Sequence, residues 1–555
     1  MKATNIFAAF AALLLSVASP SFAAEEPTAA DLAKIRLRET FVQYLLERDH
    51  KTTTVKNGAA FVPCSFAMRW CRIMQSVLLP SRTPMKRRQF LKDTAKASAA
   101  IWAAYTFTAQ TAKAQGARND RPRVGLIGLG GQGQFDSVLV AEHGDIVALC
   151  DVNTLKIDDA RKRLGDKIKE NVATYQDYRK LLDRNDIDVI VQATTDHWHT
   201  IVNLAALRSG RDVYGEKPFS LTIEEGKLLR KVVKETGRVF QLGTQQRSAK
   251  QVMDGGPHPR PFQEAVELVR NGRVGKLKQV WVAIPYVSMK GGPFEPQACP
   301  DCLNWDMYQG QSPDRPYTAR RYHPFRGWFD YCGSMAADWG NHHMDIAHWG
   351  MDVENTGPIS VEGRGLFPNE GKPDCFDVPD RFFARLQYAN GIEILFFTSL
   401  NVRHTYGFPV DPHVETPQDK LDWMFGKDVP DEIKTCDRNG VMFIGDKGRI
   451  FVNRANVYGK AAEELADNPL PADAWHVRPS ETHMKNFFDC VKSRETPVAS
   501  AEIGHRSLTP CQLAVISMRL GGRKLRWDPD KEEVVGDPEA KAMQAREQRK
   551  PYTIS

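Results

Sequence analysis

A glycine-rich turn between a short apolar run and a helix-like segment constrains the fold of this chain more than any other feature. The run Val124–Ile127 leads directly into Gly128, Gly130 and Gly133, spaced as GxGxxG, and the helix-like stretch QFDSVLVAEH follows. In this motif the first glycine permits a tight turn, the second lets the backbone approach a pyrophosphate, and the third lets the helix pack closely on the strand. The spacing therefore predicts a dinucleotide-binding βαβ unit with phosphate at the helix N-terminus.

An aspartate at the end of the next apolar run completes this fingerprint. The run DIVALCD ends at Asp151, at about the twenty-residue separation that the motif requires. A carboxylate in this place accepts hydrogen bonds from the adenosine ribose hydroxyls and repels a 2′-phosphate. We therefore expect NAD as the cofactor, with NADP less favoured, and Lys156 lies near enough in the sequence to moderate that preference.

Strand-like and helix-like segments continue to alternate after this unit. Apolar runs at 189–195, 211–218 and 238–247 are separated by helical patterns, which predicts a parallel, doubly wound sheet. We place this nucleotide-binding domain at residues 118–245. Ligands of such sheets bind beyond the carboxyl ends of the strands. The side chains that follow strand ends, and are therefore expected to bind cofactor together, are Thr194, His199, Lys217 and Gln245.

A histidine-rich segment, DWGNHHMDIAHWG at residues 338–350, carries further candidate chemistry. In a helix, Asp338 and His342 stand four residues apart on one face, and Asp345 lies one turn further along it. Such a pair fits a metal site, a proton-transfer site or a buried polar cluster, and no metalloprotease-type signature accompanies it. The segment alone leaves these three interpretations open.

Two segments near the N-terminus have the pattern of export signals. The first carries a basic residue, an apolar run and small residues suited to cleavage. The second, at 85–117, places Arg87 and Arg88 before an alanine-rich stretch, as in a twin-arginine signal peptide. We expect residues 1–84 to be an over-extended start or a fused remnant. The twin-arginine export machinery would then carry the folded protein, with its cofactor, to a periplasmic or other extracytoplasmic compartment.

Charge and cysteine content exclude several classes of protein. The 555-residue chain has a net charge of +7, and its basic residues are interleaved with acidic ones, so no stripe suited to nucleic acid is present. After the leader, no apolar run is long enough to span a membrane. Ten cysteines do not make a disulfide scaffold in a chain of this size, and the single CxxC of Cys299 and Cys302 is weak evidence for zinc.

Several motifs occur together in the order typical of one family of oxidoreductases. The stretches GEKPFS, ATTDHWH and GTQQR, the pair Asp338-x-x-x-His342 and the closing HMKNFFDCVKSRETPVASAEIGHRSL resemble the Gfo/Idh/MocA family. The similarity extends over about residues 120–530. Two positions depart from the family: Thr195 stands where proline is common, and Ser334 stands where a second glycine is common. The resemblance is specific for the family and gives no substrate.

The resemblance implies a two-domain α/β protein. An N-terminal doubly wound Rossmann domain would be followed, at residues 246–535, by an α+β domain with a large open, mostly antiparallel sheet, and by a tail at 536–555. Runs such as KQVWVAI, DRFFARLQYA, IEILFFTSL and GRIFVN agree with strands there. In the family one face of this sheet packs on the nucleotide domain and the other commonly forms oligomers, so we expect a homo-oligomer.

By the same resemblance, Lys217, Asp338 and His342 are the catalytic residues beside the nicotinamide ring. A histidine is suited to accept the proton of a secondary alcohol, and a lysine to stabilise negative charge on its oxygen. Asp338 would orient His342 or hold a neighbouring hydroxyl, while Glu216 would lie near the nicotinamide ribose. Asp345 would brace His342 or cap a buried polar network. No metal is expected, because nicotinamide accepts the electrons and lysine provides the positive charge.

An aromatic and arginine-rich stretch at residues 303–331 precedes this helix. Its Trp305, Tyr317, Tyr322 and Trp328 fit a carbohydrate pocket, because aromatic faces stack on sugar rings. They fit a rigid loop with core aromatics equally well. The sequence does not choose between the two.

The preferred hypothesis is an exported NAD-dependent oxidoreductase acting on the CH–OH groups of sugars or polyols. Little free dinucleotide is expected outside the cytoplasm, so the cofactor would be tightly held and regenerated on the enzyme. An NAD-dependent glycoside hydrolase that oxidises its sugar transiently is the alternative. Lys217 favours the oxidoreductase, since hydrolases that resemble this family often lack that lysine. A non-catalytic sugar-binding protein is a third hypothesis, against which the presence of both Lys217 and His342 argues.

Overall fold

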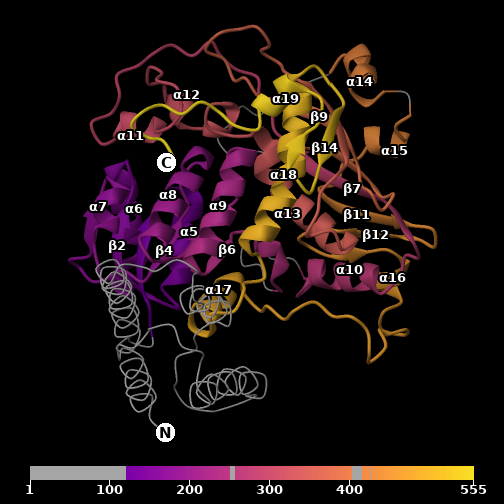
Figure 1. Ribbon diagram of the computed structural model, residues 1–555, viewed down its shortest axis with the longest axis horizontal. Coiled ribbons are helices and arrows are strands. Elements are labelled where there is room, and N and C mark those ends of the chain that lie inside the picture. Colours follow the sequence, from indigo (N-terminus) through magenta and orange to yellow (C-terminus); the bar gives the residue numbers. More distant parts are fainter. Residues whose placement is uncertain (1–120, 250–256, 403–415, 427, 555) are drawn as a thin grey trace, which may run out of the picture. The chain divides into compact units, whose positions relative to one another are not determined.

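Two β-sheets organise the part of the chain that the structure describes. The computed structural model describes residues 121–249, 257–402, 416–426 and 428–554, so the predicted leaders at 1–84 and 85–117 lie outside it. Figure 1 shows the first sheet and its helices in indigo to magenta and the second domain in pink to yellow. Within the described ranges, no helix combines the length and the apolar character needed to cross a membrane.

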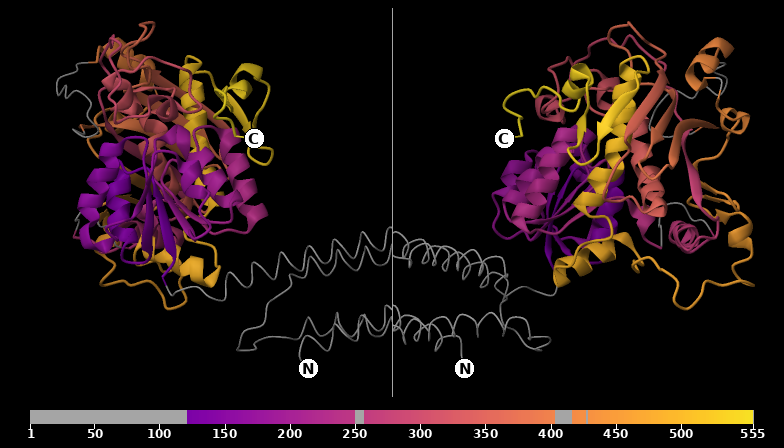
Figure 2. Two further views of the ribbon diagram at one scale, coloured as in Figure 1. Left: turned by 90° about the vertical axis from the view of Figure 1, so that its left-hand side faces the viewer. Right: turned by 45° about the vertical axis from the view of Figure 1, so that its right-hand side comes forward.

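The first sheet has six strands in the order β3-β2-β1-β4-β5-β6, and every pairing in it is parallel. Helices lie on both of its faces (Figure 2). This is the predicted doubly wound arrangement, with its topological switch point between β1 and β4. The strands are β1 (Arg123–Ile127), β2 (Asp145–Cys150), β3 (Ala173–Tyr175), β4 (Val189–Gln192), β5 (Asp212–Gly215) and β6 (Phe240–Leu242).

The central strands of this sheet are apolar along their length because both of their faces are covered. All residues of β4 and β5 are buried. Only β3 has no counterpart in the sequence prediction: its three residues are partly exposed at the edge of the sheet and carry too little pattern to be recognised. The surrounding helices are α5 (Gly131–Val140), α6 (Thr154–Leu164), α7 (Tyr178–Leu182), α8 (Asp196–Arg208) and α9 (Ile223–Thr236).

The second sheet has nine strands in the order β13-β12-β11-β7-β10-β9-β8-β14-β15. Its pairings are antiparallel except for β7 with β10, which is parallel. The predicted mostly antiparallel sheet is therefore confirmed. Its strands are β7 (Leu277–Tyr286), β8 (Ser360–Leu366), β9 (Arg381–Gln387), β10 (Glu393–Val402), β11 (Gly440–Gly445), β12 (Arg449–Val452), β13 (Val457–Tyr458), β14 (Leu525–Asp528) and β15 (Glu533–Val534).

One face of the second sheet carries α13 (Ser334–Met351), which contains the histidine-rich segment, and α18 (Ala501–Arg519). All residues of α13 are buried. Two glycines permit this close packing: a Cβ at Gly340 would lie 2.6 Å from the Phe396 ring, and one at Gly350 would lie 2.4 Å from the Phe443 ring. The helix is therefore fixed against the sheet, which gives its polar side chains a rigid base.

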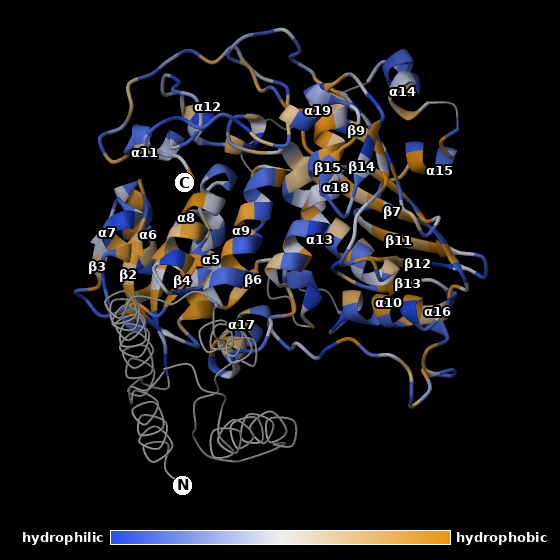
Figure 3. Ribbon diagram, viewed as in Figure 1, coloured by the Kyte–Doolittle hydropathy of each residue, from blue (hydrophilic) through white to orange (hydrophobic). Residues whose placement is uncertain are grey.

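The other face of the sheet is partly covered by the chain itself. Two short helices, α14 (Gln418–Phe425) and α15 (Asp431–Lys434), mix apolar and hydrophilic residues (Figure 3). Met424 and Ile433 on these helices join a cluster with Trp281 and other buried side chains of the sheet. The expected homo-oligomer stays a prediction.

The C-terminal segment, predicted as a tail at 536–555, packs on the body of the protein. It contains the helix α19 (Pro538–Ala542). Further on, Arg549 Nε donates to the carbonyl oxygens of Gly310 and Ser312 at 3.0 and 3.1 Å. The Tyr552 hydroxyl donates to Asp306 Oδ2 at 2.6 Å. These residues clamp the segment that leads to α13.

Candidate active site

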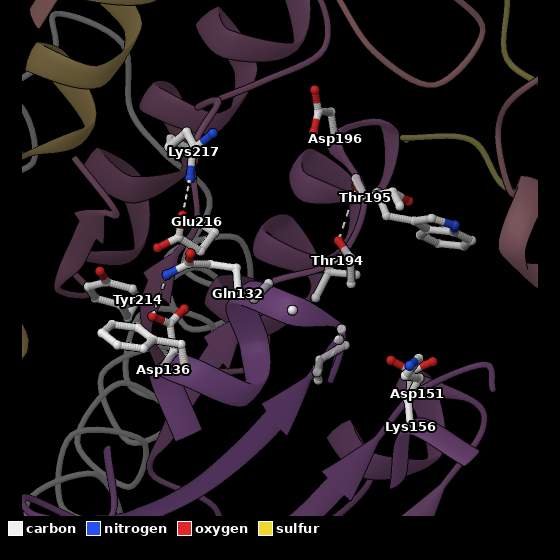
Figure 4. Close-up of a pocket in the computed structure, with 18 of the residues that line it drawn as sticks. Gln132, Asp136, Asp151, Lys156, Thr194, Thr195, Asp196, Tyr214, Glu216 and Lys217 are labelled. Carbon is white, nitrogen blue, oxygen red and sulfur yellow. Dashed lines mark hydrogen bonds between the residues drawn. The ribbon is translucent and has the colours of Figure 1, made fainter. Parts of the chain in front are cut away.

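A cavity of about 880 Å³ opens at the carboxyl ends of the parallel strands. Residues of the loops after β1, β2, β4 and β5 line it, together with residues of the segment 305–326 and of α13. Figure 4 shows Asp151 and Lys156 at one end and Glu216 and Lys217 at the other, with Thr194 between them. The cavity thus spans the position at which this fold binds an extended dinucleotide.

The glycine turn fits a dinucleotide for the reasons that the sequence suggests. Gly128 has φ +87° and lies against the backbone of Ala193, while a Cβ at Gly133 would lie 2.0 Å from the carbonyl oxygen of Gly128. By contrast, nothing lies within 4 Å of a Cβ built at Gly130 or Gly131, and both residues line the cavity. This open space at the N-terminus of α5 is suited to a pyrophosphate.

Asp151 lines the adenosine end of the cavity. Its carboxylate accepts from the backbone N–H groups of Leu129 and Asn153 at 2.7 and 2.8 Å. Burial raises the pKa of this carboxyl, and those two hydrogen bonds work against the increase. Each carboxylate oxygen retains a lone pair for a ribose hydroxyl.

Replacement of Asp151 by asparagine is therefore expected to change the choice of cofactor. Asparagine keeps one acceptor oxygen for the loop and removes the charge that repels a 2′-phosphate. The ratio of NADP⁺ to NAD⁺ affinity, measured by calorimetric titration, should rise by about tenfold. Lys156→Met should move the ratio in the opposite direction. An unchanged ratio in both variants would show that neither residue contacts the ribose.

Lys217 and Asp338 meet although they are 121 positions apart in the sequence. Lys217 Nζ donates to Asp338 Oδ1 at 2.9 Å, and Arg326 Nε lies 3.1 Å from the same oxygen. The Asp338 side chain is fully buried and that of Lys217 is 10% exposed. Burial opposes ionisation of Asp338, but the charges of Arg326 and Lys217 outweigh it and lower the pKa of this carboxyl. The aspartate is therefore a carboxylate that holds two cations at the cavity wall.

His342 lies one turn along α13 from Asp338 and lines the same cavity. Its side chain is buried, and its ring meets that of Trp339 edge-on at a centroid distance of 5.4 Å. Asp345 does not brace this histidine. Its carboxylate instead accepts two hydrogen bonds from Arg247, at 2.7 and 2.9 Å, which is the alternative of a buried polar network.

The predicted cofactor ligands fall into two groups. Thr194, Glu216 and Gln245 line the cavity, and Gln245 Nε2 donates to Glu216 Oε1 at 2.7 Å. His199 lies behind the wall: its Nδ1 is 2.7 Å from the carbonyl oxygen of Pro218, and its Nε2 is 3.1 Å from that of Thr194. It therefore ties the loop after β4 to the loop after β5 and positions the residues that line the cavity.

Sequence reasoning missed several residues of the cavity wall, among them Asp196, Asp136 and Arg326. Asp196 opens α8 and is buried, with Oδ2 making no hydrogen bond within the described structure. Asp136, from α5, and Arg326, from the segment before α13, also line the cavity. Asp196 follows Thr194 and Thr195 in the ATTDHWH motif, so that motif could have identified it. Asp136 and Arg326 carry no motif of their own.

The aromatic stretch is mainly a rigid loop. Trp305 stacks on Tyr308 at 5.0 Å and meets Tyr317 edge-on at 5.1 Å. Trp328 is buried beneath Arg321. Of the four aromatic residues that the sequence suggested, Tyr322 lines the cavity, and its hydroxyl accepts from Asn153. The loop therefore forms one wall of the cavity chiefly through its own packing.

Among the described residues, no group of three or more His, Cys, Asp or Glu side chains is arranged to hold a metal ion. Cys299 and Cys302 are free thiols. The pair Asp338 and His342 is likewise occupied with lysine, arginine and aromatic neighbours rather than with a third ligand group. The expectation that the reaction needs no metal stays a prediction.

Fold and site together define the class of this protein: an oxidoreductase with an NAD-binding Rossmann domain and a C-terminal α/β domain. The chain belongs to the Gfo/Idh/MocA oxidoreductase family. Residues 122–244 match the family profile described as "Oxidoreductase family, NAD-binding Rossmann fold". Residues 277–439 and 431–554 match "Oxidoreductase family, C-terminal alpha/beta domain". The resemblance seen in the sequence motifs is thereby confirmed.

Curated relatives match a smaller part of the chain. A "Glycosyl hydrolase family 109 protein 2" of Shewanella sp. (strain ANA-3) is 34% identical over 161 residues, which are 25% of this chain and 35% of that protein. An "Alpha-N-acetylgalactosaminidase" of Shewanella oneidensis is 31% identical over 109 residues, 19% of this chain and 24% of that protein. The chain therefore aligns with about a third of these relatives' length or less.

Solved structures with a similar fold cover more of the chain at low identity. The aldose-aldose oxidoreductase from Caulobacter crescentus, complexed with glycerol, is 15% identical with a TM-score of 0.49, and covers 73% of this chain and 99% of its own. The WlbA dehydrogenase from Bordetella pertussis, in complex with NADH and UDP-GlcNAcA, is 18% identical with a TM-score of 0.47, and covers 74% and 99%.

Proposed function

We propose that this protein is an NAD-dependent oxidoreductase that transfers hydride between a secondary carbon of a sugar or polyol and a tightly held nicotinamide cofactor. The supporting observation is the meeting of Lys217 with Asp338, at 2.9 Å, on the wall of the cavity that the glycine turn also lines. A cation held at a buried cavity wall to which a histidine also contributes is what oxidation of an alcohol requires.

The residues at this wall would have different roles in the oxidation of the alcohol. Asp338 keeps its negative charge and holds the Lys217 ammonium in place. Lys217 would bind the substrate oxygen and stabilise the negative charge that develops on it. His342, on the same helix face as Asp338, would accept the hydroxyl proton. Bound NAD would supply the hydride acceptor.

A second candidate function is an NAD-dependent glycoside hydrolase that oxidises its sugar transiently. The observation that favours it is that curated relatives carry the name glycosyl hydrolase family 109. The same cavity residues would act in the oxidation step of either reaction. The two functions differ in the net product, since a hydrolase restores its cofactor and releases an aglycone.

One assay separates the two functions. The purified protein is mixed with NAD⁺ and a panel of free monosaccharides, polyols and aryl glycosides, N-acetylgalactosaminides included. An oxidoreductase accumulates the absorbance band of reduced nicotinamide with a free sugar or polyol. A hydrolase releases the aryl group with no lasting change in the band. If neither signal appears with any compound, the proposed chemistry is wrong.

We also propose that the protein is exported by the twin-arginine route. The support is the sequence around Arg87 and Arg88, which lies outside the described residues. Cell fractionation of the native host should find the wild-type protein outside the cytoplasm. Replacement of both arginines by lysine should retain it in the cytoplasm, and equal distribution of the two forms would refute this route.

A further inference from the structure

Two buried carboxyl groups line the same side of the cavity, and the proposed mechanism uses neither of them. Asp136 comes from α5 and Glu216 follows β5. Both line the cavity, with 1% and 3% of their surfaces exposed. In the view of Figure 4 both lie near Tyr214, with the Gln132 side chain between them, on the side of the cavity opposite Asp151. We refer to Asp136 and Glu216 as the carboxyl pair.

The protein holds each member of the pair in place. Gln132 Nε2 donates to Asp136 Oδ1 at 2.9 Å, and Gln245 Nε2 donates to Glu216 Oε1 at 2.7 Å. The Glu216 carboxylate also approaches the backbone so closely that a Cβ at Gly243 would lie 2.2 Å from Oε1. Because these contacts hold both carboxyl groups in the cavity wall, any negative charge on them acts on a ligand bound in the cavity.

Positive charge near the pair is scarce. In the described part of the chain, Asp136 forms no ion pair, and its Oδ2 is buried without a hydrogen bond. Lys217 lies next to Glu216, but its Nζ is held by Asp338. Burial, followed by the charge of Glu216, raises the pKa of Asp136 well above its usual value. Burial also raises the pKa of Glu216, to about 7, against the effect of Lys217.

Two carboxyl groups in this situation titrate as one unit, because the second negative charge is opposed by the first and by burial. The pair therefore retains a proton near neutral pH. An additional positive charge in the cavity would favour release of that proton. Removal of the positive charge would favour binding of the proton again.

The bound cofactor is the natural source of such a charge. With the pyrophosphate at α5 and the adenosine at Asp151, the nicotinamide half would extend towards Thr194 and Glu216. The oxidised ring carries a positive charge and the reduced ring is neutral. Reduction of the nicotinamide would therefore change the charge on the side of the cavity that carries the carboxyl pair.

We propose that Asp136 and Glu216 act as one carboxyl pair that releases a proton to solvent when NAD⁺ binds and keeps it when NADH binds. The pair then favours the oxidised cofactor, and it does so more strongly as the pH rises. This role rests on the cofactor of the proposed function and not on its substrate. These two side chains would then set the relative affinity of the protein for NAD⁺ and NADH.

Tyr214, His483 and Asp338, which lie around the pair, keep their protonation states over this pH range. Burial raises the pKa of Tyr214 well above its usual value and lowers the pKa of His483 to about 4. The pKa of Asp338 is lowered, so this group stays ionised. The groups that face the pair from each neighbouring element are Gln132 of α5, Tyr214 of β5, Lys217, Gln245, Asp338 of α13 and His483 of α17 (His483–Ser493).

The test is the ratio of the dissociation constants of NADH and NAD⁺, measured by calorimetric titration between about pH 5.5 and about pH 8.5. In the wild-type protein this ratio should rise by about tenfold across the range. Glu216→Gln should move the midpoint of this rise to lower pH, because Asp136 then ionises without a neighbouring negative charge. Asp136→Asn should keep the rise but move its midpoint to lower pH, because Glu216 then ionises without a neighbouring negative charge. The double variant, which has neither carboxyl group, should show no rise.

Glu142→Gln is the matched control, since Glu142 is an exposed carboxylate on the wall of the same cavity. It should behave as the wild-type protein does. A flat ratio in the wild-type protein, an unshifted midpoint in both single variants, or a rise that persists in the double variant would overturn the role of the pair. Absence of binding of both cofactors to the wild-type protein would instead refute the proposed function, and with it the pair's role. Thermal unfolding of each variant shows whether it is folded. If one of the two single carboxyl variants does not fold, the other still tests the pair.

Discussion

Replacement of Lys217 by methionine should lower the rate of hydride transfer by about a thousandfold while leaving NAD binding within about threefold of the wild-type value. Methionine keeps most of the side-chain volume and removes the ammonium. In the proposed mechanism, the substrate oxygen then loses the cation that would stabilise its developing negative charge. Asp338 remains paired with Arg326, at 3.1 Å, so the cavity wall keeps its structure. Single-turnover kinetics and cofactor titration measure the two effects separately.

Lys156→Met is the matched control for this variant. Lys156 lines the same cavity at its adenosine end, where its ammonium lies 3.6 Å from Asp159. This variant should change cofactor affinity and leave the hydride-transfer rate nearly unchanged. If Lys217→Met transferred hydride as fast as Lys156→Met, Lys217 would have no part in the chemistry.

Replacement of Arg247 by methionine should lower the free energy of unfolding by about 3–5 kcal/mol. Arg247 is buried, donates to Asp345 at 2.7 and 2.9 Å, and lies 2.7 Å from Glu354. Its guanidinium also covers the ring of Trp349 at 4.7 Å. Without the arginine, two carboxylates stay buried or half-buried with no cation. Since Arg247 connects the segment just after β6 to Asp345 of α13, activity should fall with stability.

The size of this effect is checked against an exposed ion pair. Arg449 lies 2.9 Å from Glu432, and both side chains are more than half exposed, so Arg449→Met should cost less than about 1 kcal/mol. Adding Asp345→Asn to Arg247→Met should recover part of the lost stability, because it removes one uncompensated charge. Urea unfolding gives all three values. Equal midpoints for the two arginine variants would mean that the buried pair does not fix α13.

The nucleotide-binding half of the fold could be read from the sequence because its signals are local. The spacing of Gly128, Gly130 and Gly133 reflects a turn that three residues determine among themselves, and the structure shows the contact of Gly133 with Gly128 that the motif requires. Asp338 and His342 could be paired because helical periodicity places them on one face. The family motifs then supplied the link between Lys217 and this helix.

The remainder depended on long-range contacts, which no local pattern encodes. Asp345 lies on α13, but its hydrogen-bond partner Arg247 is 98 positions away in the sequence. Asp136 looks in the sequence like an ordinary residue of a surface helix, but in the structure it is buried and interacts electrostatically with Tyr214 of β5 and with Glu216, which follows that strand. The C-terminal segment reads as a polar tail because its contacts, such as that of Tyr552 with Asp306, join residues 246 positions apart.

The central claim is that this cavity transfers hydride directly between substrate carbon and nicotinamide, and isotope transfer tests it most directly. A carbon-deuterated substrate from the panel is mixed with protein and NAD⁺, the reaction is stopped within one turnover, and the nicotinamide is examined by nuclear magnetic resonance. We predict deuterium at C4 of the ring with the wild-type protein and none with Lys217→Met. Conversion of the substrate while the ring stays unlabelled would contradict the account.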